Sequence, residues 1–481
     1  ISNPPVFKRK IKDLLQRLHL YGFYKRVHGY EEQRLYHVVE QLGLPKERIT
    51  RIDHHTCHAS AAYYGIPQDE PSLIFTCDGG GDDVCATVSI GDGQITRIAT
   101  TPKGHSIGNL YSRTTLVMGM KPWEHEWKLM GLASYAHEYG VKKAMKVFSQ
   151  FIDIADQNPL MFQNLTDTPS QEFYPLVREK TEGLRFDWIA GAVQRTTENL
   201  LTRWVRNAIE VTGIHKIVCG GGVFMNIKAN MDIAQLPEVN DISVFPSCGD
   251  ESLAMGAAWY LYHKLTGESV DPLSDLYLGP QFSEQEYRDA LSHELYTLTH
   301  HTCIEAVIAD HLAKGDVVAN FQGRMEWGAR ALGNRSILAN PSIRDMVKEL
   351  NERIKYRTWW MPFTFSVLEE DAEKYLVNPK KIDAPYMIMA FDTHALAEED
   401  LIAAIHPYDL TARPQIVKKA TNPRYYRIIN EFKKRTGVGA VLNTSFNLHG
   451  DPIVCTVDDA LSTFKASGLR YLALGNYFVE K

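Results

Sequence analysis

The spacing of hydrophobic and polar positions changes repeatedly along the chain between the period of strands and the period of helices. Short apolar runs predict strands at 49–52, 73–77, 216–219, 242–245, 316–321 and 438–442. Helical periodicity predicts helices over 188–211, 251–265, 303–314, 345–354 and 424–435, and a charged helical stretch over 11–39. The segments 84–90 and 94–100 alternate around Gly91-Asp-Gly93, which predicts a hairpin. Repeated strand–turn–helix units indicate an α/β protein with ligands at the strand ends.

Length and turn content predict two domains. A chain of 481 residues is too long for one hydrophobic core. The turn-rich segment Asp271–Pro280 loses helical periodicity, so we place the boundary there, giving domains 1–272 and 273–481. The chain begins at Ile1 rather than Met, and we expect N-terminal sequence to be missing.

Composition narrows the class of partner. The net charge is −6 and no block of five like charges occurs, which argues against nucleic acid or an anionic membrane as a general partner. Seven cysteines without C-x-x-C spacing indicate free thiols in a reducing cytoplasm. No apolar run approaches ~18 residues, so no transmembrane helix is expected. The sequence leaves the oligomeric state open.

A metal site is predicted from the histidines of Asp53-His-His-Thr-Cys-His58. His54 and His58 are four residues apart, which places both imidazoles on one face of a helix. A site that still holds substrate needs an oxygen donor, and Asp250 at a strand end is the first candidate, with Asp78 second. His55 faces another side of that helix. The alternative is that these histidines are merely packed.

Two glycine turns follow predicted strands, where backbone amides can approach phosphates at helix starts. The nucleotide-binding candidates are Gly79, Gly80, Gly220, Gly221, Gly222, Asn226 and Gly249. The alternative is that both turns are only tight turns. Neither matches the P-loop or the G-x-G-x-x-G fingerprint, which argues against those two folds.

An anion site is predicted in the second half of the chain. The loop Gly323–Arg335 packs three arginines and three glycines into thirteen residues, with one glutamate. Lys355 and Arg357 are two residues apart and point the same way if the segment is extended. With Arg330 they could clamp phosphate or carboxylate, whereas the alternative is a salt-bridged turn.

Polar side chains near this clamp predict a site for a small planar ligand. The substrate-binding candidates are Arg335, Ser366, Asn443, Ser445 and Asn447. The last three follow a predicted buried strand and offer amide and hydroxyl groups, although such clusters most often form turns.

Four motifs in order resemble one family closely. The segments His54–His58, Glu124–Ala133, Gly323–Leu338 and Asn443–Asn447 are similar to those of the O-carbamoyltransferases that decorate nodulation factors and antibiotics. The resemblance covers essentially the whole chain. It implies an N-terminal domain like the tRNA threonylcarbamoyl transferase, which has an actin/sugar-kinase (ASKHA) fold, and a YrdC-like α/β C-terminal domain.

The resemblance also implies an activity. Carbamoyl phosphate and ATP would give carbamoyl-adenylate and pyrophosphate in the C-terminal domain, where Lys355, Arg357 and Arg330 neutralise phosphate charge. A divalent metal, implied to be iron(II), would be held by His54, His58 and Asp250 while the carbamoyl group passes to a hydroxyl of a small molecule or oligosaccharide. Asn443 and Ser445 could hold the carbamoyl amide. His55 is the candidate for removing the hydroxyl proton, and ligand type alone leaves zinc and manganese open.

Two other functions remain as alternatives. An enzyme of the tRNA-threonylcarbamoylation type would need a basic surface, which the net charge of −6 disfavours. A non-catalytic nucleotide sensor would not need the Lys355–Arg357 clamp. One departure from the family is expected to matter, since no short His-Asp-Ser-Ala-like turn precedes His54.

Overall fold

The computed structural model describes residues 37 and 39–481, which belong to two compact units divided after Asp53. In the first unit the described residues include the 3₁₀ helix η1 (Lys46–Arg48). The strand predicted over 49–52 is wrong, because two apolar residues separated by Thr50 and Arg51 lack strand alternation and the segment is irregular. The helix predicted over 11–39 falls almost entirely outside the described residues.

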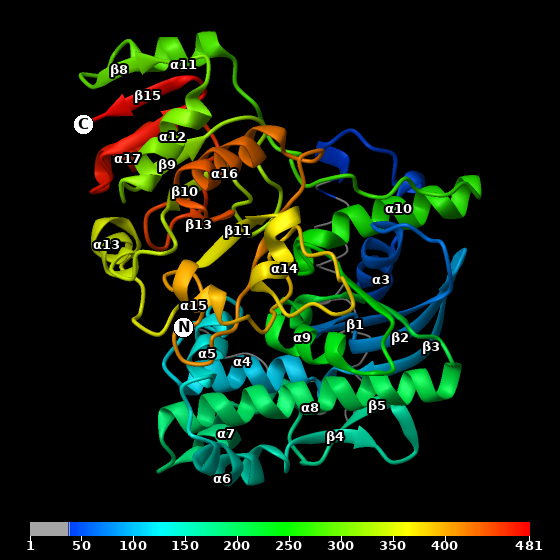
Figure 1. The fold of residues 1–481 in the computed structure, drawn as a ribbon. Helices are drawn as coiled ribbons and strands as arrows, with labels where there is room; N and C mark the ends of the chain where they lie inside the picture. The colour runs from blue at the N-terminus through cyan, green and yellow to red at the C-terminus, as the bar shows by residue number, and fades with distance from the viewer. Residues whose placement is uncertain (1–36, 38) are drawn as a thin grey trace. The chain divides into compact units, whose positions relative to one another are not determined.

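The second unit, His54–Lys481, contains a five-stranded sheet in the order β3-β2-β1-β6-β7. Figure 1 labels its strands β1, β2 and β3. The strands are β1 (Ser72–Gly81), β2 (Val84–Asp92), β3 (Gln94–Pro102), β6 (Lys216–Gly220) and β7 (Asp241–Val244). The predicted hairpin is confirmed, since β2 and β3 pair antiparallel around Gly93, whose φ is +68°. β6 and β7 run parallel to β1. The apolar run Leu73-Ile74-Phe75 is fully buried, as expected for a strand covered on both faces.

The helices of the first half pack on this sheet or on other helices that cover it. They are α3 (His54–Tyr64), α4 (Ile107–Val117), α5 (Glu126–Ala133), α6 (Glu138–Phe148), α7 (Tyr174–Thr181), α8 (Phe186–Thr212), α9 (Ile227–Gln235) and α10 (Leu253–Thr266), with the small hairpin β4 (Ile152–Ala155) and β5 (Asn158–Asn164). The long helix predicted over 188–211 is confirmed as α8, which ends at Gly213 in a left-handed conformation. α10 lies directly on α3, because a Cβ on Gly256 would be 1.9 Å from the Cys57 carbonyl oxygen.

The second half of the chain forms an eight-stranded mixed sheet in the order β12-β11-β13-β10-β9-β14-β15-β8. Its strands are β8 (Thr297–His300), β9 (Val318–Phe321), β10 (Arg335–Ala339), β11 (Thr364–Leu368), β12 (Gln415–Val417), β13 (Ala440–Ser445), β14 (Tyr471–Leu474) and β15 (Tyr477–Glu480). Its helices are α11 (Glu284–Leu291), α12 (Ile304–Ala313), α13 (Met346–Leu350), α14 (Ala372–Tyr375), α15 (Leu396–Asp400), α16 (Pro423–Thr436) and α17 (Val457–Ala466). The architecture is therefore mixed α/β.

The segment Asp271–Pro280 has no helix or strand and separates the two sheets along the sequence. The domain boundary at 272/273 stays a prediction. Among the described residues, no helix combines the length and apolar character needed to cross a membrane.

Candidate functional site

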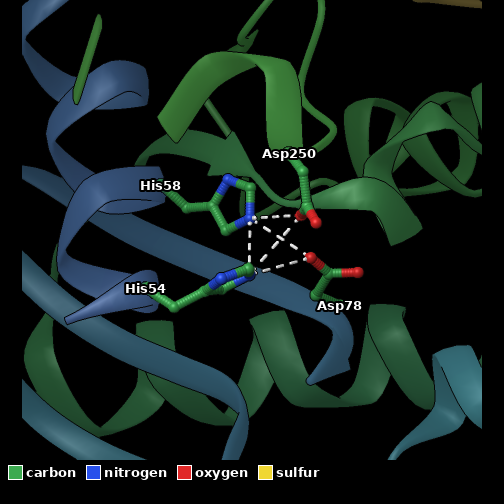
Figure 2. Close-up of side chains that lie close together, drawn as sticks. All are labelled: His54, His58, Asp78 and Asp250. Atoms are coloured by element: carbon green, nitrogen blue, oxygen red, sulfur yellow. Dashed lines mark hydrogen bonds and ion pairs between the residues drawn. The ribbon is translucent and has the colours of Figure 1, made fainter. Parts of the chain in front are cut away.

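Four potential metal ligands from three parts of the first half converge (Figure 2). His54 and His58 come from the first turns of α3, Asp78 from the end of β1, and Asp250 from the 3₁₀ turn η5 (Asp250–Ser252) before α10. One ligand atom from each lies within 4.8 Å of all the others. Asp78 Oδ2 is 3.2 Å from both imidazole Nε2 atoms, and Asp250 Oδ1 is 3.6 and 3.7 Å from them.

The chemistry of this donor set fits a divalent metal ion. Two imidazole nitrogens and two carboxylate oxygens pointing at one space form a site of intermediate hardness, suited to iron(II), zinc or manganese. His58 Nδ1 lies 3.1 Å from Ser252 Oγ, which orients the ring so that Nε2 faces the cluster. The structure thus brings together all four metal-ligand candidates predicted from the sequence.

Electrostatics of the cluster reflect burial and close opposite charges. Burial lowers the pKa of His58, but hydrogen bonding to Asp250 and Asp78 outweighs it, so the pKa is raised. Burial raises the pKa of Asp78, and hydrogen bonds from His54 and His58 reverse this, so its pKa lies below its usual range. Asp78 is therefore ionised at neutral pH, as a metal ligand must be.

The two glycine turns pack against the residues of this cluster. A Cβ on Gly220 would be 2.8 Å from the His58 carbonyl oxygen, and one on Gly221, whose φ is +94°, would be 2.4 Å from the Cys77 carbonyl oxygen. A Cβ on Gly222 would lie 3.2 Å from Asp78 Oδ1. The nearby Gly80 has a φ of +131°, and a Cβ there would meet the Lys103 side chain. These glycines permit the close approach that forms the cluster, and their role in nucleotide binding stays a prediction.

Asn226 and Gly249 have local structural roles. Asn226 Oδ1 accepts the Ala229 N–H as the N-cap of α9, and its amide pairs with the Gln194 amide. Gly249 directly precedes Asp250, and a Cβ there would lie 2.5 Å from a Glu251 carboxylate oxygen. Since both Asn226 amide atoms already have partners, nothing favours it over other residues as a nucleotide contact.

The surroundings of His55 speak against the predicted role as a catalytic base. Its side chain is fully buried, with Nδ1 2.7 Å from Thr76 Oγ1 and Nε2 3.1 Å from the Val84 carbonyl oxygen. Burial, and then the neighbouring histidines, lower its pKa to about 4. Both nitrogens have partners inside the protein, so His55 ties α3 to β1 and β2.

Lys355 and Arg357 meet at the end of β13, and the segment between them is not extended. Lys355 ends the π-helix η6 (Asn351–Lys355), and Tyr356 is left-handed with a φ of +43°. Lys355 Nζ donates to Ser445 O at 2.5 Å and Asn447 Oδ1 at 2.6 Å, and Arg357 donates to Thr444 Oγ1 at 3.2 Å. The turn at Tyr356, rather than an extended strand, brings both cations to the same strand end.

Further cations surround this pair. Burial, followed by Arg357, lowers the pKa of Lys355 well below its usual range; burial, followed by Arg330, lowers the pKa of Arg357 to about 10. Burial together with Arg330 and Arg357 also lowers the pKa of Arg413. Lys128 of α5 has its pKa lowered by burial and by Arg357. We call Arg330, Lys355, Arg357, Arg413 and Lys128 the cation cluster.

The cation cluster has the charge of an anion site. Arg330 Nε is buried without a hydrogen-bond partner among the described residues. Lys355 is buried and the other four cations are partly buried. Their mutual repulsion is unfavourable unless an anion joins them, and several phosphate oxygens would supply that charge. Perturbed pKa values shared by clustered cations are typical of a functional site.

The predicted substrate residues form a buried polar network beside the cluster. Asn443 Nδ2 donates to Ser366 Oγ at 2.9 Å and to the Ala331 carbonyl at 3.1 Å, while Ser366 Oγ donates to Gln415 at 2.7 Å. Ser445 Oγ donates to Asn447 Oδ1 at 2.7 Å, which also accepts from Lys355. Asn443 Oδ1 is buried without a partner among the described residues, so it could accept the amide of a bound ligand.

Arg335, predicted to bind substrate, has a structural role instead. It is fully buried and its guanidinium donates to the backbone carbonyls of Gln322, Gly323, Asn334 and Pro280. Glu326 Oε1 accepts the backbone N–H groups of Leu332, Asn334 and Arg335. These two residues hold the Gly323–Arg335 loop and thereby fix Arg330.

The metal-ligand cluster and the cation cluster meet through two loops. A Cβ on Gly328 would lie 2.9 Å from Ser247 Cβ, and the Trp327 and Phe245 rings are 6.0 Å apart. Burial lowers the pKa of Arg330, while Cys248 and Glu251, beside Asp250, partly oppose this. The loop that carries Asp250 therefore contacts the loop that carries Arg330.

Arg413 and Lys128 were missed in the sequence. Arg413 precedes Pro414 and β12 without any motif, so no local signal marks it. Lys128 lies within Glu124–Lys128, a charged stretch that looks like a solvated helix face. Only the tertiary structure places both beside Arg357.

Comparison with known proteins agrees with the motifs. Residues 12–259 match the family model for the carbamoyltransferase N-terminus, and residues 309–481 match that for the carbamoyltransferase C-terminus. Nodulation protein NolO of Bradyrhizobium diazoefficiens is 32% identical over 443 residues, which are 89% of this chain and 79% of that protein. The 3'-hydroxymethylcephem-O-carbamoyltransferase of Amycolatopsis lactamdurans is 30% identical over 266 residues, covering 54% of this chain and 48% of that enzyme. A crystal structure of full-length HypF covers 38% of this chain and 22% of that chain at 19% identity, with a TM-score of 0.27, which is too low to carry an argument.

Proposed function

We propose that this chain, which belongs to the carbamoyltransferase family and is therefore a transferase, uses ATP to move a carbamoyl group from carbamoyl phosphate to a hydroxyl oxygen. The observation that carries the proposal is the contact between the metal-ligand cluster and the cation cluster through the Asp250 and Arg330 loops. Two chemically distinct clusters whose loops contact each other suit a two-step reaction in which the intermediate made at one cluster is used at the other.

The first step takes place at the cation cluster. Water cleaves carbamoyl phosphate to carbamate and inorganic phosphate, and a carbamate oxygen attacks the α-phosphorus of ATP. The bond to the β-phosphate oxygen breaks, which releases pyrophosphate and leaves carbamoyl-adenylate. Lys355, Arg357 and Arg330 neutralise the phosphate oxygens, and Arg413 adds a further positive charge.

The polar network orients the small reactant. Asn443 Oδ1, which has no partner among the described residues, accepts an N–H of the carbamoyl group. Ser445 and Asn447 fix the Lys355 ammonium, since both accept hydrogen bonds from it. Ser366 acts through Asn443, because its hydroxyl accepts the Asn443 amide.

The second step takes place at the metal-ligand cluster. His54, His58, Asp78 and Asp250 would hold a divalent ion, for which iron(II) is our proposal and zinc or manganese the alternatives. A bound ion would supply Lewis-acid stabilisation of the adenylate phosphate. The acceptor hydroxyl attacks the carbamoyl carbon, the carbon–oxygen bond to the phosphate breaks, AMP leaves, and the hydroxyl proton passes to solvent water. Backbone amides of Gly80 and of the Gly220–Gly222 turn are proposed to contact phosphate, whereas the Gly79 N–H already donates to Asp78 Oδ1.

The folds of the two domains, the cellular compartment and the class of acceptor are also proposals. The hairpin β1–β2–β3 continued by parallel β6 and β7 supports an ASKHA-like first domain. The mixed sheet that carries Ser445 on β13, with Lys355 of η6 bonded to it, supports a YrdC-like second domain. All seven cysteines are free, which supports a reducing cytoplasm. The acceptor is proposed to be a small molecule or a saccharide, with neither nucleic acid nor membrane as partner.

Carbamoyl-phosphate-dependent exchange of labelled pyrophosphate into ATP tests the proposal. The full chain is expected to catalyse exchange without any acceptor, because the attack of carbamate on ATP is reversible and precedes transfer. Absence of exchange in folded protein loaded with iron(II), zinc or manganese would instead favour the nucleotide sensor.

A further inference from the structure

Trp123 is an exposed tryptophan in a disfavoured conformation. It lies in the loop between α4 and α5, and 68% of its surface is exposed. Its φ is +65°, in the left-handed region that bulky residues rarely adopt. Strained backbone conformations cluster at functional sites, where contacts with the surrounding structure hold them in place.

Neighbouring residues fix both the backbone and the ring of Trp123. Glu126 Oε1 accepts the Trp123 backbone N–H at 2.6 Å. The Arg113 guanidinium lies over the indole, 5.1 Å from its centroid, and Arg113 Nε donates to the Gln171 carbonyl at 3.0 Å. The guanidinium occupies one face of the ring. An indole fixed on one face loses little conformational entropy when a ligand covers the other.

The indole lies beside the metal-ligand cluster. A Cβ on Gly79 would be 3.9 Å from Trp123 Nε1 and 3.5 Å from Asn109 Oδ1. Gly79 follows the ligand Asp78, whose Oδ1 accepts the Gly79 N–H at 2.6 Å. A molecule stacked on the indole would therefore have one edge next to Asp78. Lys121 and Glu124, which form an ion pair beside Trp123, offer polar groups nearby.

We propose that Trp123 is the specificity-determining residue for the acceptor and that it stacks on a pyranose ring of a saccharide. The C–H face of a pyranose is apolar, whereas its hydroxyls point outward from the ring edge. A flat, fixed indole with charged groups nearby complements that pattern better than it complements an acyclic alcohol. The stacked ring would present one of its hydroxyls toward Asp78. The transfer of the carbamoyl group to that hydroxyl rests on the proposed function.

The test measures binding of methyl β-D-glucopyranoside, methyl β-D-galactopyranoside and the methyl glycoside of N-acetylglucosamine to the full chain by NMR titration. Acyclic D-glucitol is the ligand control. The variants are Trp123→Ala and Trp123→Phe, and the control variant is Tyr139→Ala, whose ring on α6 is also 68% exposed. Pyrophosphate exchange is measured in every preparation.

At least one glycoside is expected to bind, and Trp123→Ala to weaken it about three- to tenfold, with partial recovery in Trp123→Phe and no change in Tyr139→Ala. Exchange should stay at the wild-type rate in all variants, because the first step needs no acceptor. The inference is overturned if no glycoside binds, if Trp123→Ala leaves binding unchanged, or if D-glucitol loses affinity equally. Trp123-dependent glycoside binding without any exchange would retain the inference and reject the proposed function.

Discussion

Replacing Lys355 by methionine removes one buried positive charge from the anion site and keeps a side chain of similar length. Lys355 is only 2% exposed, and its ammonium donates to four oxygens of Ser445 and Asn447. At an effective dielectric constant of about 20, one charge ~4 Å from a phosphate oxygen contributes about 4 kcal/mol. Part of this is offset, because burial lowers the Lys355 pKa and so disfavours the charged form. We take the remaining contribution as about 2–4 kcal/mol, which corresponds to a loss of about 30- to 1000-fold in kcat/KM.

The assay is the initial rate of carbamoyl-phosphate-dependent pyrophosphate exchange at varied ATP. Lys348→Met is the matched control, because Lys348 lies seven residues earlier on α13 and its side chain is 76% exposed. Since Lys355→Met also leaves buried oxygens without a donor, thermal unfolding is measured on the same sample to establish that the variant is folded. A folded Lys355→Met protein with exchange within about threefold of wild type would refute the electrostatic argument.

Three further results are expected. Removing the metal ion with a chelator should stop AMP release while sparing pyrophosphate exchange, and adding iron(II), zinc or manganese separately should restore AMP release. Loss of pyrophosphate exchange together with the metal would contradict the assignment of the two steps to two separate clusters. Burial, and then Asp232, raise the pKa of Glu198 from 4.5 to about 7. Between pH 4.5 and about 7 the native state therefore binds more protons than the unfolded state, and the free energy of unfolding falls as the pH rises through this range. In Glu198→Gln, the decrease in the free energy of unfolding between pH 4.5 and 8, measured by urea unfolding, should be smaller by about 3 kcal/mol. Parallel pH profiles of the wild type and the variant would contradict this prediction. Gly221→Ala should destabilise the protein by about 2–4 kcal/mol in calorimetry, because the new Cβ would be 2.4 Å from the Cys77 carbonyl oxygen. Gly213→Ala, whose Cβ would meet nothing within 4 Å, should destabilise it by about 1 kcal/mol. Equal losses would show that left-handed backbone strain alone is responsible.

Local sequence signals predicted the parts of the site that depend on local geometry. The spacing of His54 and His58 defines one helix face, and Asp78 and Asp250 follow buried strands, so their convergence could be expected. The role of His55 could not be predicted, because its partners Thr76 and Val84 come from strands that only the folded chain brings to α3. The same is true of Arg335, whose carbonyl partners belong to a loop rather than to a substrate, and of Arg413, which no motif marks. The turn between Lys355 and Arg357 could not be predicted, because the left-handed residue Tyr356 is not a glycine or asparagine that would have signalled a turn.

The most direct measurement of the division of labour is the rate of pyrophosphate exchange and of AMP release in His54→Ala and Lys355→Ala, each assayed on folded protein. The account predicts that His54→Ala keeps exchange near the wild-type rate while AMP release falls by about a hundredfold or more, and that Lys355→Ala loses exchange. Equal loss of both half-reactions in both variants would contradict it.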